Sequence, residues 1–154
     1  MSLIAVWIIR YGHILSAATW VGGYTLLAFV LVPFVAQSAG EQDLSAALGR
    51  VTITAVRALT YTGVLTIAFG LLLVTRTHGY DHLLGTRWGA LILMAMVIAI
   101  ALLGIGDGAL RPALRRLAGG DVAAGATARR WALIGFVLTA LAVGIMTGAV
   151  YTGG

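Results

Sequence analysis

The sequence predicts an all-α membrane protein, built as a four-transmembrane-helix bundle. Of its 154 residues, 60% are apolar and only 10% are charged, whereas soluble domains average about 45–50% apolar and roughly 25% charged residues. The mean hydropathy is +1.01. Four apolar runs each reach the roughly 20 helical residues that a bilayer core about 30 Å thick requires. We therefore expect residues 1–154 to form a single integral membrane domain.

The four apolar runs set the expected spans. The first run has no basic segment before it and is much longer than the apolar region of a signal peptide, so we expect it to be retained as a helix. A more polar connection separates each run from the next. The expected spans are about 11–35, 56–74, 88–110 and 131–151.

The first connection carries a helical pattern of its own. Apolar residues recur in it at the spacing that places them on one helix face. We expect an interfacial helix over about 42–52 that runs into the second span. The third connection contains "AGGDVAAGATA" and is expected to form a flexible turn. The apolar residues of the helical pattern are Leu44, Ala47, Leu48 and Val51.

The arginine residues predict the orientation. All ten basic residues are Arg, and seven lie in or beside the first and third connections. The positive-inside rule places the side richer in Arg in the cytoplasm. We expect both termini on the outer side of the plasma (inner) membrane of a prokaryote, with connections one and three cytoplasmic. The seven are Arg50, Arg57, Arg111, Arg115, Arg116, Arg129 and Arg130.

Several classes of chemistry are excluded by composition. The chain has no Cys, so it has no disulfide, thiolate ligand or thiol nucleophile. It contains no phosphate-binding loop, zinc motif, nucleophile elbow or nucleic-acid-binding signature. The expected partner is therefore the lipid bilayer and not nucleic acid. Any chemistry must depend on His, carboxylates, Met, Tyr or a bound cofactor.

One face of the first span combines a histidine with small and aromatic residues. Small residues let a large group approach the backbone. This group is either another helix or a flat macrocycle. An ionisable side chain at this depth is costly and indicates function by default. The alternative is an interface histidine bonded to Ser, Thr or a backbone carbonyl. The face consists of His13, Ser16, Ala17, Trp20 and Tyr24, bordered by Gly12 and Gly23.

All three histidines are expected at the outer end of the bundle. Neutral imidazole binds haem iron and copper, and Arg pairs with carboxylates such as haem propionates. We expect haem b with His13 as one axial ligand, His78 as the favoured second and His82 in reserve. The other residues expected at the cofactor are Trp20, Tyr24, Gly23, Arg10, Arg76 and Arg87.

Simpler interpretations of these outer residues stay open. His78 precedes Gly79, so the pair is also typical of a helix C-terminus. His82 fits a solvated loop residue. The outer arginines fit side chains that extend from the helices toward the membrane surface.

The motifs resemble those of a known family. "RYGHILSAATWVGGYTLLAFVLVPF" and "GTRWGALILMAMVIAIALLGIGDGALRPALRRL" resemble the CopD-like copper resistance membrane proteins and, more distantly, the HemJ-type protoporphyrinogen oxidases. The shared pattern is His-x6-Trp-x-Gly-Gly, and the resemblance covers about half of the chain. It implies a four-helix membrane bundle that binds b-type haem or handles copper, with the first-span histidine as ligand. The pattern falls on His13, Trp20, Gly22 and Gly23.

At two positions this chain differs from these relatives in residues that bear on the relatives' chemistry. Relatives carry a Lys in the third span where this chain has Ala95, and the chain has no Lys at all. HemJ-type proteins have a Pro-Arg pair where Pro33 is followed by Phe34. These departures argue against protoporphyrinogen oxidation.

Three functions are therefore expected as alternatives. The first is a haem b protein that performs electron transfer or redox chemistry at the outer face, with a quinol or a redox protein as partner. The second is CopD-like copper binding or transport through His13, His78 and His82. The third is an accessory structural subunit, in a homodimer or larger membrane complex, since 21 glycines support close helix contacts. Whether the protein is an enzyme is left open.

Other polar or soft side chains fit structural roles better. Met94 and Met96 point about 200° apart on a helix, so they cannot chelate one ion together. Asp107 and Arg111 have the spacing of an ordinary ion pair within a helix, which we favour over a proton relay. Pairing of Arg57 with Asp107 is the alternative.

Overall fold

The computed structural model describes residues 3–38, 42–76 and 79–152, and all regular structure in these residues is helical. Four helical rods are long and apolar enough to cross a membrane, which confirms the predicted class. The first rod consists of α1 (Leu3–Leu26), the π-helical η1 (Leu27–Leu31) and α2 (Val32–Gln37). The second is α3 (Gln42–Val74).

The second half of the chain repeats this arrangement. The third rod consists of α4 (Arg87–Ile105), the π-helical η4 (Gly106–Leu110) and α5 (Arg111–Ala118). The fourth is α6 (Ala124–Thr152), and a short 3-10 helix, η3 (Tyr80–His82), precedes α4. Odd rods therefore contain a π-helical turn, whereas even rods are continuous α-helices.

The π-helical turns explain why the odd rods continue past their prolines. Pro33 and Pro112 each lie in the first turn of the helix that follows a π-helical segment. A proline lacks an N–H, and its ring clashes with the carbonyl four residues earlier in a regular α-helix. The preceding N–H groups, of Val32 and Arg111, instead donate to carbonyls five residues back. This widened turn accommodates the proline, so the third rod extends to Ala118 instead of ending near residue 110.

The connection predicted as an interfacial helix is continuous with the second span. Residues 42–52 form the first turns of α3, which runs for 33 residues without a break. A helix of this length spans about 50 Å, more than the bilayer core needs. The location of its first turns at the membrane surface stays a prediction.

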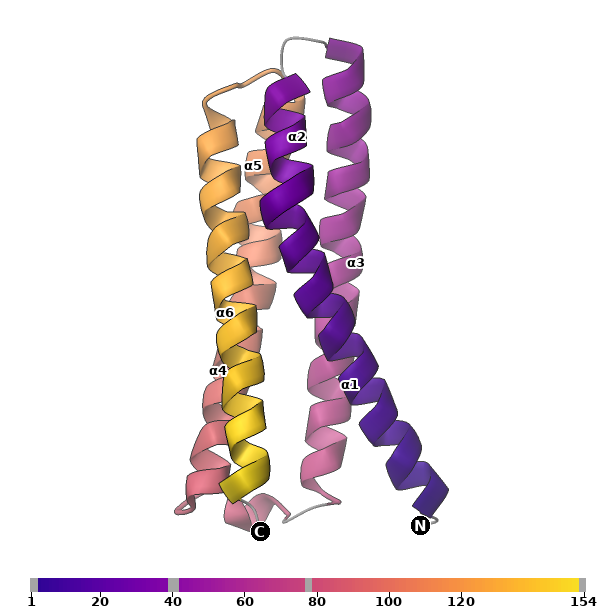
Figure 1. The fold of residues 1–154 in the computed structure, drawn as a ribbon, viewed down its shortest axis with the longest axis vertical. Coiled ribbons are helices and arrows are strands. Elements are labelled where there is room, and N and C mark those ends of the chain that lie inside the picture. Colours follow the sequence, from indigo (N-terminus) through magenta and orange to yellow (C-terminus); the bar gives the residue numbers. More distant parts are fainter. Residues whose placement is uncertain (1–2, 39–41, 77–78, 153–154) are drawn as a thin grey trace.

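The rods pack as two pairs that meet at one end of the bundle. Helix α1 lies along α3, and α4 lies along α6. At the arginine-rich end, which holds α2, α5 and the first turns of α3 and α6, the four rods pack together (Figure 1). At the terminal end, which holds both ends of the chain and η3, α1 diverges from α4 and α6 (Figure 1). The side of the membrane that each end faces stays a prediction.

The hydrophobic core follows this arrangement. The buried residues of α1 begin only at Ser16, and the fully buried leucines include Leu110, Leu114 and Leu117 near the arginine-rich end. Small residues allow close helix contacts. A Cβ on Gly63 would lie 2.8 Å from the Trp20 ring, so that glycine leaves room for the indole. The core thus holds α1 firmly from its middle onward.

Candidate functional site

His13 lies on the face of α1 that packs against α3. Its Nδ1 is 2.9 Å from the backbone carbonyl oxygen of Thr66. The ring lies over Gly70, where an added Cβ would be 3.1 Å from His13 Cε1. The half-buried imidazole therefore joins two helices, as the interface interpretation of this residue expects.

The hydrogen bond also determines which nitrogen of the neutral ring is available for coordination. A carbonyl oxygen only accepts, so Nδ1 carries the proton and Nε2 keeps its lone pair. Metal-binding histidines commonly donate their second ring N–H to a backbone carbonyl, which sets the tautomer and the ring orientation. The interface role and a ligand role for His13 are therefore chemically compatible.

The remaining residues of this face are packed against protein. Trp20 is 5% exposed and Tyr24 is 2% exposed. The indole lies on Gly63 of α3, Gly23 lies under Leu59 of α3, and the Tyr24 ring lies on Gly135 of α6. Leu59 of α3 thus fills the space beside Gly23, while glycines of α3 and α6 make room for the two aromatic rings.

Tyr24 also links the two helix pairs. Its hydroxyl donates a hydrogen bond of 3.0 Å to the carbonyl oxygen of Leu102 in α4. It follows His13 by eleven residues, about 16 Å of helical rise. Tyr24 therefore belongs to the middle of the bundle, away from the level of the histidine.

The arginines expected at the cofactor are exposed at the terminal end. Arg10, Arg76 and Arg87 are all exposed. Within the described ranges, the two ion pairs do not include any of them. Their guanidinium groups are thus accessible to an anionic ligand.

The other histidines belong to the connection between α3 and α4. The carbonyl of His82 accepts a 2.6 Å hydrogen bond from the Thr86 hydroxyl, whose oxygen accepts from the Gly89 N–H at 3.0 Å. This arrangement caps α4. His82 is therefore held near the start of α4, while His78 lies outside the described residues.

The convergence of the three histidines stays a prediction. His13 lies against α3, His82 lies beside α4, and α1 diverges from α4 at this end (Figure 1). Among the residues with a described placement, no group of three His, Asp or Glu side chains has the geometry of a metal site.

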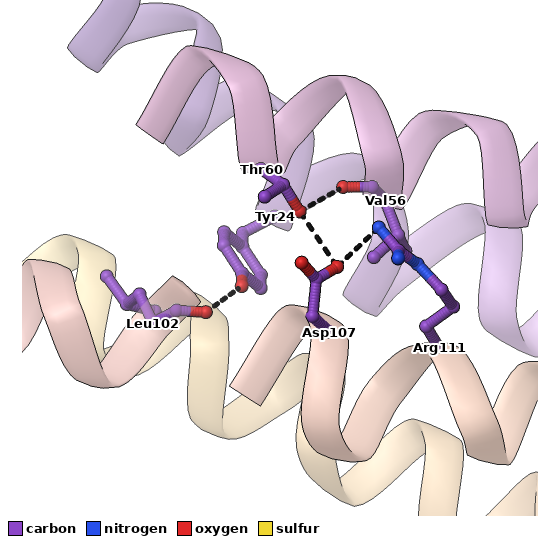
Figure 2. Close-up of polar contacts among 6 residues, drawn as sticks. All are labelled: Tyr24, Val56, Thr60, Leu102, Asp107 and Arg111. Atoms are coloured by element: carbon purple, nitrogen blue, oxygen red, sulfur yellow. Dashed lines mark hydrogen bonds and ion pairs between the residues drawn. The ribbon is translucent and has the colours of Figure 1, made fainter. Parts of the chain in front are cut away.

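A polar cluster that the sequence did not predict in full lies near the middle of the bundle. Figure 2 shows Asp107 of η4 between Thr60 of α3 and Arg111 of α5. Its Oδ1 accepts a hydrogen bond of 3.0 Å from the Thr60 hydroxyl and forms an ion pair with Arg111. The expected pairing of Asp107 with Arg111 is confirmed. The contact with Thr60 spans 47 residues, so no local spacing could have indicated it.

Three side-chain hydrogen bonds therefore join different rods within the described part of the chain. His13 bonds α1 to α3, Tyr24 bonds α1 to α4, and Thr60 bonds α3 to η4. Each has a backbone carbonyl or a carboxylate as its acceptor. The bonds of Tyr24 and Thr60 hold the two helix pairs in one rotation relative to each other, and the bond of His13 does the same for α1 and α3.

Comparison with known proteins does not assign the chain to a family. No protein-family model, curated protein or solved structure matches it. The resemblance to CopD-like and HemJ-type proteins therefore stays an expectation based on the motifs.

Proposed function

We propose that this protein is a haem b-binding membrane protein that transfers electrons at the terminal end of its bundle. The observation that supports the proposal best is the bond between His13 Nδ1 and the Thr66 carbonyl. This bond prepares Nε2 as a ligand, and imidazole is a standard axial ligand of haem iron. Because the chain lacks Cys, the haem would be held without a thioether link.

The other residues have separate roles in this proposal. His78 is the favoured second axial ligand and His82 is the reserve, since both belong to the connection at the same end. Arg10, Arg76 and Arg87 would pair with the propionates, because guanidinium groups match carboxylates in two-point geometry.

In this proposal, the packed residues of α1 hold that helix in position. Trp20, Gly23 and Tyr24 contact α3, α4 and α6, so they would hold α1 at the rotation that directs His13 toward the ligand. The haem supplies one-electron chemistry when bound. The electron donor or acceptor would be a quinol or a redox protein.

The optical spectrum of the purified, haem-supplied protein tests the proposal. We expect a Soret band in the wild type and its loss in His13→Ala, with the helical circular dichroism unchanged. Trp7→Ala is a matched control, because Trp7 is 64% exposed on the same helix, and we expect it to keep the band. A wild-type protein without a Soret band, or a band that His13→Ala leaves intact, contradicts the proposal.

Copper binding is the second candidate, because the same Nε2 lone pair suits copper. Metal analysis separates the two functions. Near-stoichiometric copper without haem, lost in His13→Ala, supports the CopD-like function.

A further inference from the structure

A groove of about 280 Å³ lies between α2 and the first turns of α6, which are neighbours at the arginine-rich end (Figure 1). One wall consists of residues from α2, among them the polar Gln37, and the other of residues from α6 and of Val122 in the turn before it. The wall residues used in the argument are Val32, Pro33 and Ala36 on α2, and Gly125, Ala126 and Arg129 on α6.

The groove combines apolar walls with one cation. Arg129 is its single charged lining residue, and its side chain is exposed. The two ion pairs found in the described ranges do not include Arg129. A mainly apolar surface next to one guanidinium group suits an amphiphile with an anionic head.

The surrounding charge favours an anion at this position. Arg130 follows Arg129, and the first turn of α6 has the positive partial charge of a helix N-terminus. The nearby carboxylate of Asp121 accepts hydrogen bonds of 2.9 Å and 2.6 Å from the Arg116 guanidinium. Asp121 is thereby compensated, so it does not neutralise Arg129.

We propose that this groove binds an anionic phospholipid of the surrounding bilayer. The lipid phosphate pairs with Arg129, and the acyl chain lies along the accessible side chains of Pro33 and Ala126. A soluble anion would leave the apolar walls without a function. A neutral phospholipid would not use the arginine.

Lipid retention by the protein tests the proposal. The protein is purified from nanodiscs that contain equal amounts of phosphatidylglycerol and phosphatidylcholine, and bound lipid is measured by native mass spectrometry. We expect the wild type to retain phosphatidylglycerol preferentially. Arg129→Gln should lower this retention about fivefold, because it removes the guanidinium group that pairs with the phosphate in the groove, a contact of about 1 kcal/mol.

Arg130→Gln is the matched control, because it removes the same charge one residue away and outside the groove lining. We expect it to change retention less than twofold. Ala126→Phe should reduce retention while Arg129 is intact, because the ring fills the groove. Equal losses in both arginine variants, or equal retention of the two wild-type lipids, would overturn the proposal. Helical circular dichroism verifies that each variant is folded.

Discussion

The position of the His13 ring depends on one small residue across the α1–α3 interface. Gly70 leaves room for it, because an added Cβ would lie 3.1 Å from Cε1 and 3.4 Å from Nδ1. The distance to Cε1 is tighter than ordinary van der Waals contact, so a methyl group at position 70 would push the ring by a few tenths of an ångström. Glycine at this position therefore favours the ring placement that bonds the Thr66 carbonyl.

We expect Gly70→Ala to displace the His13 ring and weaken its bond to Thr66. In the haem protein, the displacement should shift the Soret maximum or lower haem occupancy, as measured by optical titration. Gly104→Ala is the control, since nothing lies within 4 Å of a Cβ added there. An unchanged spectrum in Gly70→Ala would show that the ring orientation does not matter for binding.

A single polar contact between α3 and η4 contributes to the stability of the helix bundle. Asp107 accepts from Thr60 and pairs with Arg111, whose side chain is 18% exposed. Removing the carboxylate leaves the guanidinium group without its counter-ion. Such a loss is destabilising even where the ion pair itself contributes little.

A double-mutant cycle of Thr60→Val and Asp107→Ala measures this link. We expect a coupling free energy of unfolding of about 0.5–1.5 kcal/mol, typical of a hydrogen bond within a protein. Unfolding in mixed micelles provides the measurement. The control cycle combines Thr60→Val with Asp121→Ala, and its effects should add within about 0.5 kcal/mol. A coupling of zero in the first cycle would exclude a stabilising bond.

The turn between α5 and α6 depends on the charge of Asp121. Hydrogen bonds from Arg116 are the main cause that lowers the pKa of this carboxyl below its ordinary value. Its Oδ1 also accepts from the Ala124 N–H at 3.3 Å, at the start of α6. Because the folded-state pKa is the lower one, the stabilisation is present above the ordinary pKa and is lost as the pH falls through the folded value.

We therefore expect the Ala124 amide to lose protection in acid. Hydrogen exchange, corrected for the intrinsic rate at each pH, should show faster opening near pH 3 than at pH 7. Asp121→Asn should remove most of this difference. Equal protection of the wild type at both pH values would contradict the role of the carboxylate.

The orientation of the whole bundle is open to a direct test because the chain has no Cys. Leu84 and Val122 are 79% and 64% exposed and lie at opposite ends. We expect a membrane-impermeant maleimide to label Leu84→Cys in intact cells. Val122→Cys should react only after the membrane is permeabilised. The reverse pattern would contradict a cytoplasmic arginine-rich end.

Much of the fold follows from local properties of the sequence. The four rods follow from runs of apolar residues, because a helix in a bilayer must satisfy its own backbone bonds. The pair Asp107–Arg111 follows from i, i+4 spacing. The extension past Pro112 could not be predicted, since it depends on a π-helical turn that replaces the usual stop at proline.

For the candidate site, the sequence alone determined which residues share a face of the first span, because 3.6 residues per turn set that face. Only the tertiary structure decided that α3 and α6 cover it, that Thr66 accepts from His13, and that Thr60 reaches Asp107. The physical reason is the difference between the two kinds of contact. Spacing within a helix is set by its own geometry, whereas contacts between helices depend on how each rod is rotated and where it crosses its neighbour.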